Sequence, residues 1–96
     1  MQISQLVWNE DILEHIARHN VTSGEVEEVC FGSPLILKSK KAAKGPNPIY
    51  YALGQTESGR YLFITFISFK HGRAMVITAR DMDQTERKYY RRRVKK

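Results

Sequence analysis

The 96-residue sequence contains one cysteine, three prolines and no long uninterrupted apolar segment. A single cysteine excludes an internal disulfide. Cys30 lies beside Val29 and Phe31 in an apolar helical pattern, which suits a buried thiol better than a nucleophile. No segment approaches the length of a transmembrane helix, and the N-terminus has no basic region followed by an apolar run of signal-peptide length. We therefore expect a cytoplasmic protein that is not inserted in a membrane.

Signals for metal and phosphate sites are also scarce. His15 and His19 lie one helical turn apart, but the glutamate of a His-Glu-x-x-His motif is missing and no cluster supplies a third ligand. The six glycines are scattered at turns and form no phosphate-binding loop. We expect no metal and no cofactor. His19 is a candidate general acid or base, or a side chain that only caps the carbonyl end of its helix.

Positive charge is the strongest compositional signal. The formal net charge is +6, and the chain has sixteen Lys and Arg residues. Ten of them fall in or beside two segments: Lys38, Lys40, Lys41, Lys44, Lys88, Arg91, Arg92, Arg93, Lys95 and Lys96. Concentrated charge favours a polyanion such as RNA, or an acidic protein, as the partner. The simpler alternative is that both segments are solvated and only keep the protein in solution.

Apolar periodicity and turn residues predict an α+β fold in a single domain over residues 1–96. Asn9 is a helix N-cap, and Thr22-Ser23-Gly24-Glu25 reads as a capping box that begins a second helix. Asp81 with Gln84 is expected to cap a C-terminal helix. The predicted strands are residues 3–8, 35–37, 49–54, 60–69 and 74–79. The expected architecture is a small antiparallel sheet of three to four strands, packed with two N-terminal helices and one C-terminal helix.

Two arginines lie at the ends of adjacent predicted strands. With a three-residue turn at residues 70–72, Leu62 lies opposite Arg80, and Arg60 is diagonal to Arg80 on the same face. Diagonal neighbours are about 7 to 8 Å apart, close enough for two guanidinium groups to converge on one phosphate. A two-residue turn would place them on opposite faces. The strand over residues 60–69 is apolar on both alternating faces, so we expect a central strand covered on both sides.

The C-terminal helix adds two groups that can move a proton. Glu86 and Tyr90 are four residues apart and share a helix face, and Glu86 is within reach of Arg80. In a catalytic interpretation, the arginines stabilise charge on phosphorus, Glu86 orients an arginine or accepts the 2′-hydroxyl proton, and Tyr90 stacks or donates a proton. In a structural interpretation, Glu86 and Arg80 form an ordinary ion pair and Tyr90 is a half-buried aromatic residue.

An ordered set of short motifs extends along residues 7–90. The set is Trp8-Asn9, Arg18-His19-Asn20-Val21, Val29-Cys30-Phe31, Leu53-Gly54, Gly59-Arg60-Tyr61-Leu62, Ile77-Thr78-Ala79-Arg80 and Glu86-Arg87-Lys88-Tyr89-Tyr90. In order and spacing it resembles the BrnT family of ribonuclease toxins from bacterial type II toxin–antitoxin pairs. No single motif is distinctive, so the resemblance depends on their order.

This resemblance implies a RelE-like fold and a metal-independent endoribonuclease that cleaves RNA. It also implies a cognate antitoxin protein, often of the ribbon-helix-helix type, that binds and silences the toxin. The implied catalytic residues are His19, Arg60, Arg80, Glu86 and Tyr90. The residues expected to bind RNA or the partner are Lys38, Lys40, Lys41, Lys44, Arg91, Arg92 and Arg93. The alternative is a non-catalytic basic module that binds RNA or an acidic protein through the same surface.

Overall fold

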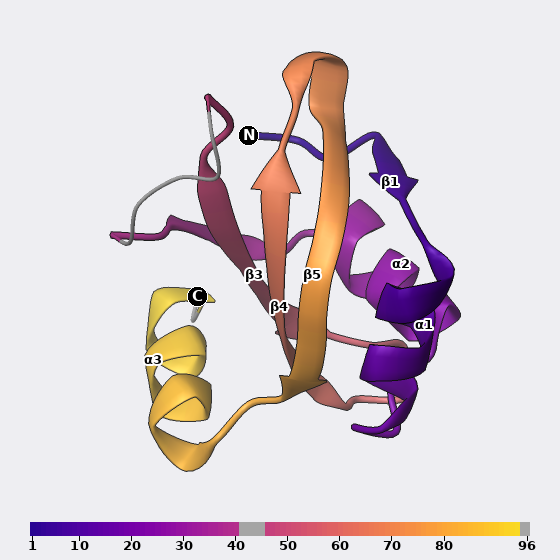
Figure 1. Cartoon of the computed structure of the whole chain (residues 1–96). Helices are drawn as coiled ribbons and strands as arrows, with labels where there is room; N and C mark the ends of the chain where they lie inside the picture. Colours follow the sequence, from indigo (N-terminus) through magenta and orange to yellow (C-terminus); the bar gives the residue numbers. More distant parts are fainter. Residues whose placement is uncertain (41–45, 95–96) are drawn as a thin grey trace.

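The computed structural model describes residues 1–40 and 46–94 (Figure 1). Lys41 and Lys44 of the predicted basic loop lie outside the described residues. The elements in chain order are β1 (Gln5–Val7), α1 (Glu10–Ala17), α2 (Ser23–Phe31), β2 (Leu35–Lys38), β3 (Ile49–Gln55), β4 (Tyr61–Ser68), the 3-10 turn η1 (Lys70–Gly72), β5 (Arg73–Asp81) and α3 (Gln84–Val94). The predicted α+β class, with two N-terminal helices and one C-terminal helix, is confirmed.

The described strands form one sheet in the order β1-β5-β4-β3-β2. Neighbouring strands are antiparallel except for β1, which runs parallel to β5. The prediction of three to four antiparallel strands is therefore wrong in number and in the direction of one edge. The first strand pairs with the last one, and Ser4 N–H donates to the Gly72 carbonyl at 2.8 Å. Pairing between such distant segments leaves no turn signal in the sequence.

Side-chain caps determine where the first two helices begin. Asn9 Oδ1 accepts a hydrogen bond from the Ile12 N–H at 2.8 Å, as the N-cap prediction requires. At α2, Thr22 Oγ1 accepts from the Glu25 N–H at 3.2 Å, while Glu25 Oε1 accepts from the Thr22 N–H at 3.0 Å. This reciprocal pair is the predicted capping box. Between the helices, Asn20 adopts a left-handed backbone conformation with φ of 59°.

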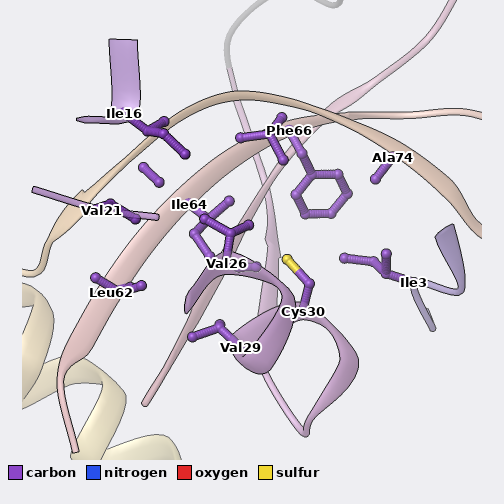
Figure 2. Packing of buried hydrophobic residues seen from close by; sticks show 13 residues of the cluster. Ile3, Ile16, Val21, Val26, Val29, Cys30, Leu62, Ile64, Phe66 and Ala74 are labelled. Carbon is purple, nitrogen blue, oxygen red and sulfur yellow. The ribbon is translucent and has the colours of Figure 1, made fainter. Parts of the chain in front are cut away.

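The sheet separates two apolar clusters. On one face, Leu62, Ile64 and Phe66 of β4 are fully buried beneath α1 and α2 (Figure 2). A Cβ at Gly54 would lie 2.9 Å from Val29 Cγ1, so α2 packs closely over β3 at this position. On the other face, α3 buries Tyr90 against the sheet in a smaller cluster. Strand β4 is central, as predicted, but α3 covers its second face less completely, and the residues there are only half-buried.

A β-bulge changes the register along β5. Near the turn, Phe66 pairs with Val76, but Thr65 pairs with Thr78, so Ile77 is an extra residue in β5. From there to the strand ends, every pair is shifted by one position from the predicted register. Within residues 1–40 and 46–94, none of the helices combines the length and apolar character needed to cross a bilayer.

Candidate functional site

The bulge divides the predicted catalytic residues between the two faces of the sheet. Arg80 pairs with Phe63 instead of Leu62, because Ile77 adds one residue to β5. Side chains alternate along a strand, so Arg80 faces α3, while Arg60 reaches α2 and the turn after α1 on the other face. The prediction that both guanidinium groups converge on one phosphate is therefore wrong.

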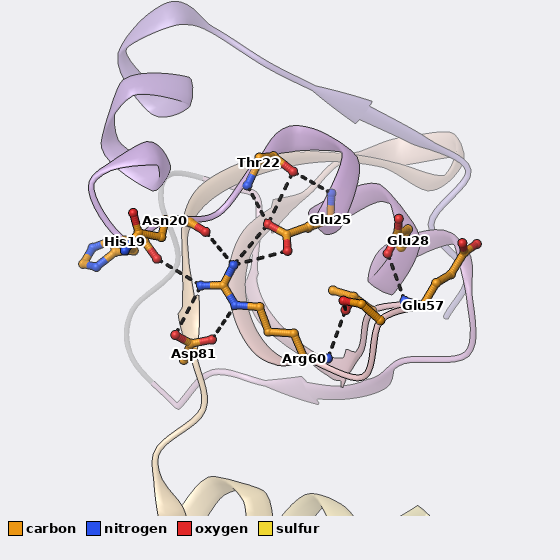
Figure 3. A network of polar contacts seen from close by, with 10 residues as sticks. His19, Asn20, Thr22, Glu25, Glu28, Glu57, Arg60 and Asp81 are labelled. Carbon is orange, nitrogen blue, oxygen red and sulfur yellow. Dashed lines mark hydrogen bonds and ion pairs between the residues drawn. The ribbon is translucent and has the colours of Figure 1, made fainter.

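Arg60 is the centre of a polar network that joins β4 and β5 to the N-terminal helices (Figure 3). Its Nε and Nη2 donate to the two carboxylate oxygens of Asp81 at 2.7 and 3.2 Å. Nη1 donates to Glu25 Oε1 at 3.1 Å and to the Asn20 carbonyl. Nη2 also donates to the His19 carbonyl at 3.1 Å. All five N–H groups of the guanidinium thus have acceptors, and none remains for a phosphate.

Charge pairing in this network favours the ionised form of every member. Hydrogen bonding to Asp81 raises the pKa of Arg60, and the same contact lowers the pKa of Asp81. The pKa of Glu25 is lowered, chiefly by its hydrogen bond to the Thr22 backbone and further by Arg60. The network therefore holds the ends of β4 and β5 to α2 and to the turn after α1. Because its charged groups are all stabilised in their ionised forms, none of them is suited to transfer a proton. Sequence reasoning assigned Asp81 to a helix cap and so missed its pairing with Arg60.

Arg80 and Glu86 form the predicted ion pair on the α3 face. Nη1 and Nη2 of Arg80 donate to the two oxygens of Glu86 at 2.8 and 2.9 Å. Glu86 Oε1 also accepts from the Asp83 N–H at 2.9 Å, and Asp83 Oδ1 accepts from the Glu86 N–H at 2.8 Å. Asp83 and Glu86 therefore form the reciprocal cap at the start of α3, and the predicted cap of Asp81 with Gln84 is wrong. The hydrogen bonds from Arg80 lower the pKa of Glu86, which makes this carboxylate a weak base.

Arg80 keeps hydrogen-bonding capacity beyond this pair. Nη1 makes its second bond to the Asp81 carbonyl at 3.1 Å, and the guanidinium carbon lies 4.5 Å from the centre of the Phe63 ring. Nε and one N–H of Nη2 have no acceptor among the described residues. With 40% of its side chain exposed, Arg80 can present these two donors to an anion while Glu86 and Phe63 fix its plane.

The other two predicted catalytic residues are less suitably placed. Tyr90 is 9% exposed, and its ring meets the Tyr61 ring edge to face with 6.0 Å between centroids. Burial raises the pKa of Tyr90, so its hydroxyl stays protonated at neutral pH. His19 lies on the α1 side, where only its carbonyl contacts Arg60 and its imidazole is directed away from the guanidinium (Figure 3). The structure therefore brings together Arg80, Glu86 and Tyr90, but not His19 or Arg60.

The exposed side of α3 is rich in basic side chains. The guanidinium carbons of Arg87 and Arg91 lie 4.4 and 5.7 Å from the centre of the Tyr61 ring. In the part of the chain that the structure describes, no carboxylate lies within ion-pair distance of five cationic residues of this helix, which are Arg87, Lys88, Arg91, Arg92 and Arg93. We call these five residues the α3 cations. The four-residue spacing of Arg87 and Arg91 was visible in the sequence, but their shared contact with Tyr61 was not.

A hollow of about 420 Å³ lies beside α3 and is lined by Leu37, Lys38, Lys40, Tyr51 and Tyr89. We call it the tyrosine hollow. It places the two described lysines of the predicted basic loop on the α3 side of the molecule, near the predicted C-terminal basic segment.

Acidic residues are concentrated on the opposite side of the sheet. Six of the ten carboxylates belong to α1 and α2: Glu10, Asp11, Glu14, Glu25, Glu27 and Glu28. The charge is thus segregated across the sheet.

Other reactive side chains offer little chemistry. The rings of His15 and His19 meet edge to face with 5.3 Å between centroids, and His15 Nε2 lies 3.0 Å from Thr78 Oγ1. Across the described residues, no three His, Cys, Asp or Glu side chains are grouped so that they could hold a metal ion. Cys30 is buried, as predicted, and burial raises the pKa of its thiol to about 12.

Comparison of the chain with models of known protein families and with curated protein sequences found no match.

Proposed function

We propose that this chain binds RNA on the α3 side of the sheet, and that it does so as the endoribonuclease toxin of a bacterial type II toxin–antitoxin pair. The observation that carries the proposal is the basic surface formed by the α3 cations beside the exposed donors of Arg80. A surface of this kind matches the phosphate backbone of RNA, which contributes affinity without sequence information.

Within this proposal, Arg80 is the residue that contacts the reacting phosphate. Its two uncommitted donors can hydrogen-bond to phosphate oxygens as negative charge builds on them during attack by the 2′-hydroxyl. Glu86 acts by orienting Arg80, because its own oxygens are occupied and its pKa is lowered. Arg60 and His19 have no part in the chemistry, since they lie on the α1 side.

The family resemblance supplies the biological part of the proposal. It implies a cognate antitoxin that binds and silences the toxin, and the positive charge of the α3 cations favours an acidic antitoxin segment that covers the same basic surface and so excludes RNA. The arrangement of two N-terminal helices, a sheet and a C-terminal helix supports a RelE-like fold as part of this proposal. A RelE-like fold alone would not establish the activity, because function depends on the site.

The decisive experiment has three arms, which measure cell growth, RNA cleavage and RNA binding. Induced expression should stop growth, and co-expression of the product of a neighbouring gene should restore it. Purified protein should cleave single-stranded RNA in excess chelator; cleavage that requires added magnesium would contradict the metal-independent mechanism. If expression is harmless and purified protein leaves RNA intact, the toxin assignment is wrong.

The binding arm uses variants matched in charge. Changing Arg91, Arg92 and Arg93 to Gln should flatten the dependence of RNA affinity on salt by about 0.7 in log–log slope for each RNA phosphate that the variant no longer neutralises. The control changes Arg18, Lys70 and Arg73 to Gln, which removes the same charge away from α3. Equal slopes for the two triple variants would show that RNA does not use the α3 surface.

A non-catalytic RNA-binding module is the second candidate. The separation of Arg60 from Arg80, with the engaged carboxylate of Glu86, favours it, because the described α3 face offers no free general base. This candidate predicts tight, salt-dependent RNA binding with no cleavage at any pH. The same RNA assays therefore separate the two functions.

A further inference from the structure

The tyrosine hollow combines aromatic walls with cationic edges. Tyr51 and Tyr89 come from different elements, β3 and α3, and Leu37 of β2 completes the apolar part of the lining. Lys38 and Lys40 supply the charge, and no carboxylate contributes to the lining among the described residues. Its volume of about 420 Å³ falls within the range of small-molecule sites, roughly 300 to 1,000 Å³.

Both tyrosine rings are held by neighbouring side chains. The Tyr51 ring lies 4.9 Å from the Phe63 ring, centroid to centroid, and its hydroxyl is 3.2 Å from Ser39 Oγ. The Tyr89 hydroxyl accepts a hydrogen bond from Arg93 Nη1 at 3.0 Å. Tyr89 nevertheless remains 37% exposed, so its surface is available to a ligand. Fixed rings bind a planar ligand with little loss of side-chain entropy.

The chemistry of the lining identifies the class of ligand. A flat apolar ring can stack on tyrosine, but an uncharged ring would gain nothing from two lysines at the edge. An unpaired RNA base satisfies both features, because the base stacks on an aromatic ring while the adjoining phosphates meet the cations. The α3 cations continue the same basic surface beyond the hollow, since Arg93 also contacts the Tyr89 ring at 5.3 Å.

We propose that the tyrosine hollow is a subsite for one unpaired RNA base, which stacks on Tyr89 or Tyr51 while Lys38 and Lys40 contact the flanking phosphates. This inference rests on the proposed RNA-binding function and adds a base-binding position to it. Stacking tolerates any base, so the subsite recognises single-stranded RNA without requiring a particular sequence.

The test compares intact and abasic RNA of equal charge. Single-stranded oligonucleotides just long enough to span the α3 surface, so that they bind in one register, carry one abasic position that is moved stepwise along the chain, and are titrated against wild type and variants. For wild type, one position should be sensitive, with an affinity loss of roughly five- to a hundredfold when its base is absent. Tyr89→Leu and Tyr51→Leu should lower the affinity for intact RNA by a similar factor and abolish this positional effect.

The matched controls are Tyr89→Phe and Tyr51→Phe, which keep each ring and remove only the hydroxyl. Both should retain the positional effect that the leucine variants lose, and thermal unfolding identifies any variant that has lost its fold. Because Tyr51 packs against Phe63, Tyr89→Leu is the safer variant. If intact and abasic RNA bind wild type equally at every position, or if the leucine variants lose no affinity, the base subsite is wrong while RNA binding stands. If wild type binds no RNA at all, the proposed function fails as well.

Discussion

Replacing Arg60 tests whether this residue holds the fold together or acts on a substrate. Arg60 joins β4 to Asp81 of β5 and to Glu25 of α2, and it also donates to two backbone carbonyls of the turn between the helices. Arg60→Ala would leave both carboxylates and both carbonyls without this partner. We therefore expect a large loss of stability and no direct effect on RNA chemistry.

The magnitude follows from the exposure of the charged groups. Removing one partner of a fully buried ion pair costs about 3 to 5 kcal/mol. The side chains of Arg60 and Glu25 are each 24% exposed, but that of Asp81 is 61% exposed and its share is reduced by solvent. We expect Arg60→Ala to lower the free energy of unfolding by about 2 to 4 kcal/mol. Arg60→Lys should recover less than half of this loss, because one ammonium group cannot reproduce the forked contacts.

Urea unfolding of wild type, Arg60→Ala and Arg60→Lys provides the measurement. Arg80→Ala serves as the control on the opposite face, where we expect a loss of about 1 kcal/mol for a partly exposed pair. RNA cleavage or binding is measured at a temperature where every variant remains folded. If Arg60→Ala unfolds at the wild-type urea concentration but has no activity, the structural role of Arg60 is refuted and the catalytic interpretation is restored.

Three further outcomes are expected. Arg80→Ala should remain folded yet lose about a hundredfold in cleavage rate; wild-type cleavage by this variant would remove Arg80 from the site. The lowered pKa values of Asp81 and Glu25 stabilise the fold above their ordinary values of 3.8 and 4.5, and this stabilisation disappears as the pH falls through the lower folded values. Urea unfolding measured at several pH values from pH 6 down to about pH 3 should therefore show a larger loss of stability for wild type than for Arg60→Ala. Parallel curves of unfolding free energy against pH for the two proteins would contradict this prediction. Cys30 should resist alkylation at pH 8 until urea unfolds the protein, and rapid labelling of the folded chain would show that the thiol is accessible.

Local chemistry made part of the fold predictable from sequence. The caps at Asn9 and Thr22 depend on side chains that bond to backbone groups only three residues away, so the sequence contains all the partners. The hairpin of β3 and β4 likewise follows from alternation and a turn, and the burial of Cys30 follows from the apolar face of a helix. The pairing of Arg80 with Glu86 was predictable because both lie beside one strand–helix junction.

The rest depended on contacts that no short segment encodes. The bulge at Ile77 has no glycine or other sequence marker, yet it reverses the direction of Arg80 and separates it from Arg60. Asp83 instead of Asp81 caps α3, while the carboxylate of Asp81 is held by Arg60 at the neighbouring strand end. The parallel pairing of β1 with β5 also depends on the tertiary packing of the whole domain.

Charged side chains at the end of β5 also favour the register that the bulge at Ile77 produces. Arg80 and Asp81 are consecutive, so they point to opposite faces, and each meets an opposite charge there. If Ile77 instead joined the regular ladder opposite Thr65, the two would exchange: Arg80 would turn towards Arg60, and Asp81 towards Glu86. Each face would then bring like charges together, so a slip of one residue would be penalised on both sides of the sheet at once. The bulged register of β5 is thus favoured over the register one residue away, because only the bulged register places opposite charges together on each face of the sheet.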